Sequence, residues 1–409
     1  MLARIALRNL ARNRRRTLLA LLVVAAGAAA LLLTTGFVRE SFAGLSEAFI
    51  RGGLGHLEVA PADASGQPVD RTGPPGFEGW QEARRAIESV PHVIGATGAI
   101  VLQGLVSKGE RSVPFVGAGL EPDREARMGL VVRLRSGREL GSRSPGEGDE
   151  EALLGLALAR SLGAAEGDVV TLTAPTADGI LNALDVRVVG LVTTGVQDLD
   201  ARFLRVHLTT AERLLATEAA GSIVVMLDDS SRTTAVGEEI VRRLSGHVPR
   251  VVVSDWRART PFYDQVRSLY AAIFGFLGTI VLVLVALSSS NTLLMTVMER
   301  VREIGALRAI GTSGSQVVRM IMCEAAWLGL LGGAAGCLLG SGAAAIIHAL
   351  RIELPPPPGA VDPMALRLRI LPSDFAWVTA TMVLVLSVAA VIPAARALRL
   401  RIAEALAHV

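Results

Sequence analysis

Four apolar stretches interrupt an otherwise mixed chain. The first, residues 17–38, has 22 residues without a charged side chain and would span about 33 Å as a helix. The second, residues 268–298, is uncharged over 31 residues and would reach about 46 Å. Because the hydrocarbon core of a bilayer is roughly 30 Å thick, both stretches predict membrane-spanning helices. The second helix should project beyond the bilayer as a stalk.

Two later apolar stretches, within residues 317–350 and 375–395, predict a third and a fourth span. An external loop at 351–374 should join them, with a polyproline II run at Pro355–Pro358. The alternative for the first stretch is a cleaved signal peptide, since Ala26–Ala28 resembles a small-residue cleavage site. Its apolar run is longer than a signal core of about 7–15 residues, which favours an uncleaved anchor.

Residues 39–267, between the first and second spans, have the composition of a soluble domain. Short β-branched runs alternate with helical patterns, which favours an α/β or α+β domain. The expected strands are His56–Ala60, Val93–Val106, Ser112–Gly119, Val169–Thr173, Val186–Thr193 and Ser222–Leu227. The expected helices are Phe77–Val90, Glu151–Leu162, Thr210–Ala216 and Thr234–Leu244. A segment rich in Gly, Ser and acidic residues, Arg138–Glu150, indicates a loop or a boundary between subdomains.

Arginine is concentrated at one set of helix ends. These arginines are Arg4, Arg8, Arg12, Arg14, Arg15 and Arg16, those of the loop Arg300–Arg319, and Arg396, Arg399 and Arg401. The positive-inside rule makes these ends cytoplasmic, so segments 1–16, 299–316 and 396–409 should lie inside and the large domain outside. Topology therefore explains the net charge of +3 and the pI near 9.3, and nucleic-acid binding is disfavoured.

The chain lacks the patterns of several enzyme classes. Lys108 is its single lysine and lies between Ser107 and Gly109, so there is no Gly-Lys-Ser/Thr loop to bind ATP. The six histidines have no metal-ligand spacing, and no nucleophile elbow is present. We therefore predict no catalytic residue and no metal site. Cys323 and Cys337 would lie about 21 Å apart on one helix, too far for a disulfide.

The polar and small residues within the spans can each be interpreted in two ways. In the third span, small residues recur every fourth position, at Gly329 and Gly333 and at Gly332, Gly336 and Gly340. They allow close helix packing, within one subunit or between two. Glu324 lies at the edge of this span, where we expect it to reach interfacial water rather than to serve in the membrane. Asn291 and Ser288–Ser290 in the second span are either packing residues or the lining of a dimer cavity.

The segment after the second span reads as a short amphipathic helix. Glu299 and Glu303 would lie one turn apart, with Arg300 within a turn of Glu303. Ile304, Leu307 and Ile310 would form an apolar stripe, and Gly311 is a stop signal. The pattern fits a solvated connector between spans, and it equally fits a cytoplasmic helix that docks into a groove of a partner.

The run NTLLMTVMERVREIGALRAIGTSGSQVVRMIMCEAAWLGLLGGAAG, from Asn291 to Gly336, resembles the FtsX-like permease domain of ABC transporters of the MacB and lipoprotein-releasing (Lol) type. The final run PAARALRLRIAEALAHV, from Pro393, is similar to the end of that family's chains, and GRELG, LALARSLGAAEGDVVTL and VVGLVTTGVQDLDARFLRVHLTTAERLL resemble its Lol-like branch. The arginine-rich amphipathic helix that we expect at residues 1–16, before the first span, is also similar to the family's pattern. The MacB branch carries its ATPase on the same chain, which this chain does not. The resemblance therefore implies a permease that works with a separate ATPase subunit.

The resemblance implies roles for particular segments. The residues it assigns to ATPase coupling are Glu299, Arg300, Glu303, Ile304, Gly305, Leu307, Arg308 and Gly311. It implies a porter-like portion at 39–137 and 210–267, with a β-rich subdomain inserted at 138–209. ATP and Mg would bind the partner ATPase and no cofactor this chain. Closure of the ATPase dimer would move the stalk helices and rearrange the outer domains.

The resemblance also implies partners and a place in the cell. The chain should be a multi-pass protein of the inner membrane that pairs with a second, identical or homologous permease. A lipoprotein, a lipid or another amphiphile would be extracted from the outer leaflet, with a periplasmic carrier as a further partner where an outer membrane exists. The alternative is a mechanical regulator that passes ATPase motion to an outer partner such as a wall hydrolase, without transporting a substrate.

Overall fold

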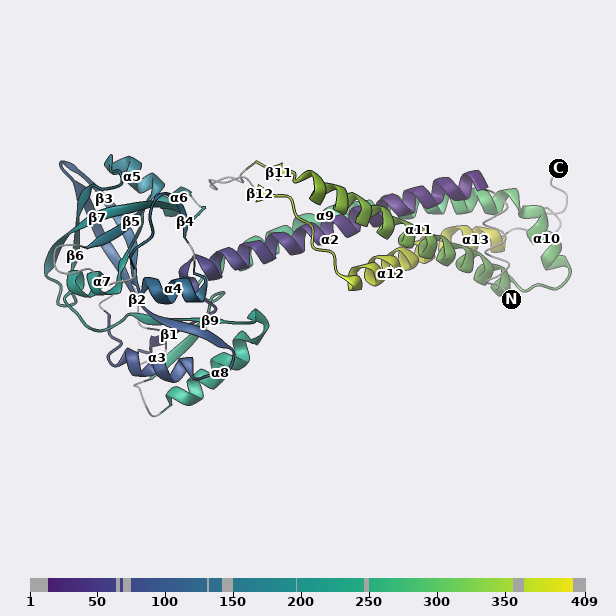
Figure 1. Ribbon diagram of the computed structural model, residues 1–409. Helices are drawn as coiled ribbons and strands as arrows, with labels where there is room; N and C mark the ends of the chain where they lie inside the picture. Colours follow the sequence, from purple (N-terminus) through teal and green to yellow (C-terminus); the bar gives the residue numbers. More distant parts are fainter. Residues whose placement is uncertain are drawn as a thin grey trace. The chain divides into compact units, whose positions relative to one another are not determined.

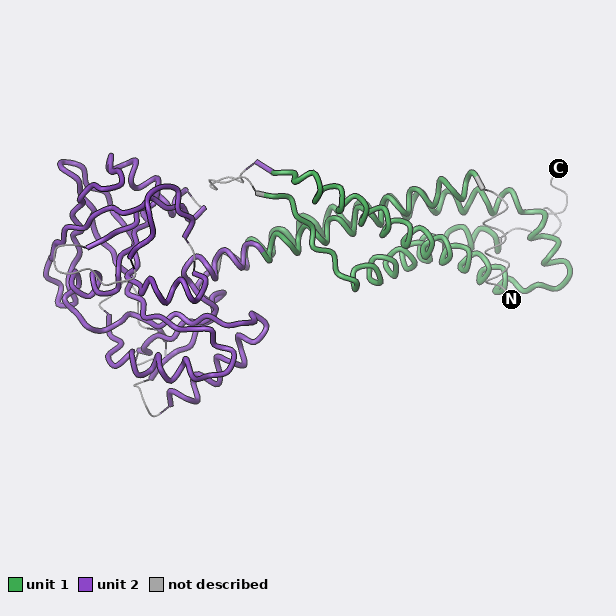
Figure 2. The backbone as a smooth tube through the Cα atoms, viewed as in Figure 1, with its two compact units in different colours: residues 1–43, 265–353, 365–409 green, residues 44–264, 354–364 purple. Residues whose placement is uncertain are grey.

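The computed structural model describes residues 14–63, 67–68, 75–130, 132–141, 150–195, 197–245, 250–355 and 364–399. The chain forms two compact units (Figure 2). Unit 1 comprises residues 1–43, 265–353 and 365–409, and unit 2 comprises residues 44–264 and 354–364. The expected amphipathic helix before residue 14, the Pro356–Pro358 part of the polyproline run, residues 142–149 and the tail after residue 399 lie outside the described residues.

Unit 1 is a bundle of long helices (Figure 1). Its helices are α2 (Arg14–Phe49), α9 (Pro261–Glu299), α10 (Val301–Ala309), α11 (Gly314–Leu350), α12 (Pro372–Ala389) and α13 (Val391–Arg399). Within the described residues, four helical segments are long and apolar enough to cross a membrane: 15–54, 263–299, 314–350 and 372–398. The four predicted spans are confirmed. Each helix extends beyond its apolar stretch, because polar residues at the ends continue the helical turns.

Glycines of α11 let two other helices approach closely. A Cβ atom on Gly329 would lie 2.7 Å from the Cα of Val383, on α12. The five glycines form two ridges along α11, Gly329 and Gly333 on one and Gly332, Gly336 and Gly340 on the other. On the second ridge, a Cβ on Gly332 would lie 2.6 Å from a side-chain carbon of Val24, on α2. Gly333 continues the ridge towards α12, and Gly336 and Gly340 continue the ridge towards α2. Both glycine ridges therefore pack against helices of the same chain.

Unit 2 contains a four-stranded antiparallel region with two helices. Its strands are β1 (Leu57–Pro61), the first half of β2 (Val93–Lys108), β9 (Ser222–Leu227) and β10 (Val251–Asp255), in the order β10-β1-β9-β2. The crossover helices are α3 (Trp80–Glu88) and α8 (Thr233–Leu244). This is a split β-α-β arrangement, in which each helix buries its apolar face, Ile87 or Ile240 for example, against the sheet.

The second half of β2 enters a further sheet. That sheet contains β3 (Arg111–Leu120), β4 (Arg133–Gly137), β5 (Glu151–Gly155), β6 (Val169–Pro175), β7 (Leu181–Thr193) and β8 (Phe203–His207). The pairs β3–β8 and β5–β7 are parallel. Short helices α4 (Pro122–Met128), α5 (Leu156–Leu162), α6 (Gln197–Asp200) and α7 (Leu208–Leu215) connect the strands. One apolar core, including Ile100, Leu154 and Val225, runs through both regions.

The structure differs from the sequence prediction in two parts of this unit. The segment Glu151–Gly155, expected to begin a helix, is strand β5, because it lies between β7 and β8 with both faces covered. The inserted β-rich region is wider than the predicted 138–209, since β3 and the second half of β2 pair with its strands and α7 closes it. The sequence pattern predicts no counterpart for β4, β8, β10, α4 and α6.

Candidate functional site

The segment between the second and third spans forms helix α10. The prediction was one helix over residues 299–316, but α10 occupies only Val301–Ala309. Arg300 has φ −104° and ψ 14°, outside the helical region, and separates α10 from the stalk helix α9. Gly311, with φ +103°, closes the segment as its stop signal predicted, since glycine adopts a positive φ without steric cost. Ser313 then starts α11 through a capping box with Gln316.

The apolar stripe of α10 is divided between two environments. Ile304 is 4% exposed and packs into the helix-bundle core with Val297 and Ile321. Leu307 is 37% exposed and Ile310, just beyond the helix, is 82% exposed. The first half of α10 is therefore docked on the bundle, where Gly305 is also buried. The second half presents apolar side chains outward, as a helix that docks on another protein does.

Charged side chains connect α10 and its flanks to three other helices. Arg300 lies 3.0 Å from Glu303, the pair that the (i, i+3) spacing predicted, and 3.2 Å from Glu324 on α11. Glu299 forms an ion pair with Arg16, at the start of α2. Arg308 donates a hydrogen bond of 3.3 Å to the carbonyl oxygen of Leu398, on α13. All the predicted coupling residues therefore lie at one end of unit 1.

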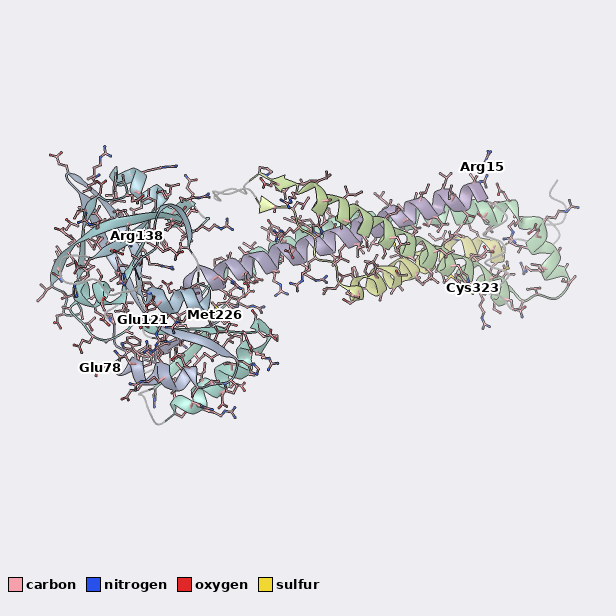
Figure 3. All side chains as sticks on the ribbon, in the orientation of Figure 1. Arg15, Glu78, Glu121, Arg138, Met226 and Cys323 are labelled. Atoms are coloured by element: carbon pink, nitrogen blue, oxygen red, sulfur yellow. The ribbon has the colours of Figure 1, made fainter. Side chains whose placement is uncertain are left out.

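Glu324 does not reach solvent, contrary to the prediction from the sequence. The expectation was a carboxylate reaching interfacial water, but its side chain is buried and accepts a hydrogen bond from Arg300. Figure 3 labels the preceding residue, Cys323, on α11 near the α10 end of the bundle. The sequence shows only that Glu324 is a carboxylate next to an apolar span. It does not show that its partner is Arg300, 24 positions earlier.

The polar residues of the second span have different environments. Ser289 is buried, and its hydroxyl has no hydrogen-bond partner within the described structure. Ser288 and Asn291 are exposed. In the most apolar window of this helix only 6% of the residues are buried, against 39% for the first span. The described residues of the chain thus leave most of the apolar surface of helix α9 uncovered.

In unit 2, an arginine whose side chain is 8% exposed joins the chain entering the α/β domain to the chain leaving it. Arg259, two residues before α9, donates a hydrogen bond to the carbonyl oxygen of Leu54, in the π-helical turn Ile50–Leu54 that follows α2. It also lies 3.5 Å from Glu58 on β1. Burial lowers the pKa of Arg259 to about 10. Phe49, Trp256 and Tyr263 pack around the same junction.

Other buried ionisable groups among the described residues of unit 2 pair with neighbours inside the domain. Glu125 and Arg205 lie 3.0 Å apart, and burial raises the pKa of Glu125. His56 accepts the backbone N–H of Leu227 at Nδ1, and burial lowers its pKa. Among the described residues, no three His, Cys, Asp or Glu side chains gather to hold a metal ion.

Helices that can cross a membrane four times, with a large α/β domain between the first and second, define a class of membrane proteins with one outsized loop domain. Residues 17–243 match the model of the MacB-like periplasmic core domain, and residues 275–402 match that of the FtsX-like permease C-terminal domain. The chain therefore belongs to the MacB- and FtsX-like permease family.

Relatives of this family include named lipoprotein-releasing proteins. The chain is 28% identical over 298 residues to the lipoprotein-releasing system transmembrane protein LolC of Neisseria meningitidis, covering 71% of this chain and 69% of the relative. It is 26% identical over 267 residues to LolC of Xylella fastidiosa, covering 64% of this chain and 63% of that relative, less than two thirds of its length. The periplasmic region of MacB from Actinobacillus actinomycetemcomitans matches 53% of this chain and 95% of its own, with a TM-score of 0.39 and 15% identity.

Proposed function

We propose that the chain is the permease subunit of an ABC transporter whose ATPase is a separate protein. The observation that carries the proposal is the two-faced helix α10, which is docked on the bundle through Ile304 and leaves Leu307 and Ile310 exposed. An exposed apolar helix end at a membrane bundle fits a groove on a soluble partner. The residues expected from the resemblance to contact the ATPase are the residues of this helix and its flanks.

The ATPase would supply the chemistry and this chain the movement. The sequence has no Gly-Lys-Ser/Thr loop, so ATP and Mg would bind the partner. Stalk helix α9 follows β10 of the α/β domain and ends one residue before α10. A force applied at α10 therefore reaches a helix that is continuous in sequence with the α/β domain. This arrangement supports mechanical transmission rather than a channel.

The substrate we propose is an amphiphile, a lipoprotein or a lipid, taken from the outer leaflet. The named LolC relatives support a lipoprotein. The largely uncovered apolar surface of α9 supports a second permease copy or homologue beside it, with the amphiphile entering between the two. The other function, mechanical control of an outer wall enzyme, uses the same coupling helix and differs in what binds outside.

The proposed location is the inner membrane, with both termini in the cytoplasm and the α/β domain outside. Thirteen arginines occur in the N-terminal segment, the Arg300–Arg319 loop and the C-terminal tail, whereas three occur in the loop of residues 351–371. Arginines in short loops favour the cytoplasmic side, which supports this orientation.

Co-purification from native membranes in mild detergent, with mass spectrometry of everything bound, tests the proposal. An ABC ATPase together with a lipoprotein or lipid supports the transporter. An ABC ATPase with a soluble hydrolase and no amphiphile favours the mechanical regulator. Repeated recovery of the chain without any ATPase contradicts both functions. The variant Ile310→Asp is the control, because it should lose the ATPase while the chain remains folded.

A further inference from the structure

We infer that the pair of half-buried Arg300 and buried Glu324 is the pivot through which α10 moves the stalk helix α9, so that Glu324 is a positioning residue for coupling. The inference rests on the proposed function and adds to it the residue that makes α10 act as a lever. Three observations carry it: the separation of α10 into a docked and an exposed half, the break at Arg300, and the burial of Glu324.

The lever follows from where α10 is held. Its nine residues are about 13 Å long. Val301 and Ile304, at its beginning, are buried in the bundle, whereas Leu307 and Ile310, at its end, are exposed. A partner bound to the exposed end therefore applies its force several ångströms away from the docked end. A rigid helix loaded in this way turns about its docked end.

Arg300 places that docked end against α9. It is the single residue between Glu299, the last residue of α9, and Val301, the first of α10, and its backbone is not helical. The angle between the two helices is therefore set at this residue, whose N–H donates to the carbonyl oxygen of Val297 and whose carbonyl oxygen accepts the N–H of Ile304. If the side chain of Arg300 were unattached, the bend would absorb the rotation of α10 and little of it would reach α9.

Glu324 prevents that loss by attaching the bend to a third helix. It lies about 15 Å along α11 from Gly314, and only 5% of it is exposed. Its carboxylate accepts a hydrogen bond of 3.2 Å from Arg300, while the same guanidinium holds Glu303 of α10 at 3.0 Å. One arginine thus connects α9, α10 and α11. A buried carboxylate in a membrane bundle is costly, and its retention calls for a role with a named partner.

The test measures movement of α9 in the assembled complex. Spin labels are placed at Leu269→Cys on α9 and Ser373→Cys on α12, both exposed, in a chain carrying Cys323→Ser and Cys337→Ala. Pulsed EPR compares the distance between labels in the nucleotide-free and ATP–vanadate states, with the co-purified ATPase bound. The variants are Glu324→Gln, Arg300→Gln and the double variant. Arg319→Gln, an exposed arginine of the same helix, is the matched control.

We expect each single variant to capture the ATPase and to reduce the nucleotide-dependent change in distance at least threefold. The double variant should be no worse than Arg300→Gln alone, because Arg300→Gln already removes the pair with Glu324 together with the pair with Glu303, and Arg319→Gln should leave the change in distance intact. An unchanged distance response in Glu324→Gln, or losses that add in the double variant, overturns the inference. If Glu324→Gln does not assemble, Arg300→Gln decides in the same way, since its side chain is less buried.

Failure of the proposed function has a different signature. In that case the labelled chain without substitutions at Arg300 or Glu324 captures no ATPase, or it captures the ATPase and shows no change in distance with nucleotide. The inference about Arg300 and Glu324 is wrong, and the proposed function still stands, when that chain responds to nucleotide and the variants respond equally.

Discussion

Gly336 lies so close to Ala25 that a Cβ atom on the glycine would come within 2.4 Å of the alanine's carbonyl oxygen. The same Cβ would lie 2.5 Å from the Cβ of Ala28, one turn further along α2. Helices α2 and α11 are therefore in backbone contact at this level. Close approach of this kind is how membrane helices gain packing energy where no hydrophobic driving force distinguishes protein from lipid.

The contact predicts that substitutions at two glycines of α11 change the stability of the protein to very different extents. Gly336→Ala should lower the free energy of unfolding by about 1–3 kcal/mol, because neither backbone nor Cβ atoms can yield without separating the helices. Gly342→Ala should not lower it, since no atom lies within 4 Å of a Cβ at that position. Thermal unfolding of both variants in the same detergent measures the difference. Equal midpoints would show that the helices separate without cost.

A second prediction concerns Arg259 at the junction of the α/β domain. Arg259→Gln should destabilise unit 2 by about 3–5 kcal/mol, because it leaves the buried Glu58 carboxylate without its cation and the carbonyl of Leu54 without its donor. Arg257→Gln, an exposed neighbour that stacks on Trp256, is the control and should change stability by less than about 1 kcal/mol. Hydrogen exchange of the backbone amides of β1 and β9 reports the loss. Similar exchange in both variants contradicts the prediction.

The sequence predicted the spans and most of the strands, because long uncharged runs and β-branched alternation are local signals. It failed at Glu151–Gly155, where the run EALLGLALA has no period that separates a buried strand from a helix. The strand is decided by its neighbours β7 and β8, which follow it by tens of residues. The same non-local pairing made the inserted region wider than predicted.

The candidate site shows the same division between local and tertiary information. The spacing of Arg300 and Glu303 and the stop at Gly311 were readable from the sequence, since each depends on neighbours within one turn. The stripe of Ile304, Leu307 and Ile310 was read as one face, yet the bundle covers only its beginning. Which part of an amphipathic helix is covered depends on where the surrounding helices end, and the period does not contain that information.

A third prediction concerns pH and His56. Its Nδ1 accepts the Leu227 N–H and its Nε2 lies 2.8 Å from the Ser230 hydroxyl, so the buried ring is held neutral, and burial lowers its pKa from the ordinary 6.5. Below about pH 6.5, His56 therefore binds a proton in the unfolded chain but stays neutral in the folded chain. Stability contributed by His56 is complete above that pH and should fall by up to about 1.4 kcal/mol per pH unit below it.

His56→Gln should remove this dependence. Denaturant unfolding of unit 2 at pH 7.5 and pH 5.5, in the full chain, gives the loss of stability for each protein. The original chain should lose more than the variant, and the difference isolates His56 because every other histidine, including the buried His207, is common to both proteins. Equal losses would mean that the ring takes up its proton without leaving its site.

The last prediction concerns the exposed end of α10. Ile310→Asp should weaken binding of the ABC ATPase at least tenfold, because an exposed apolar anchor at the centre of a contact contributes well over 1 kcal/mol and a carboxylate cannot be buried there without a partner. The free chain should remain as stable as before, since Ile310 is 82% exposed and supports no core. Ile94→Asp, at an exposed apolar residue of the α/β domain, is the control and should bind the ATPase normally. Affinity measured in nanodiscs decides: if both variants bind as tightly as the unmodified chain, the ATPase does not seat on this end of α10.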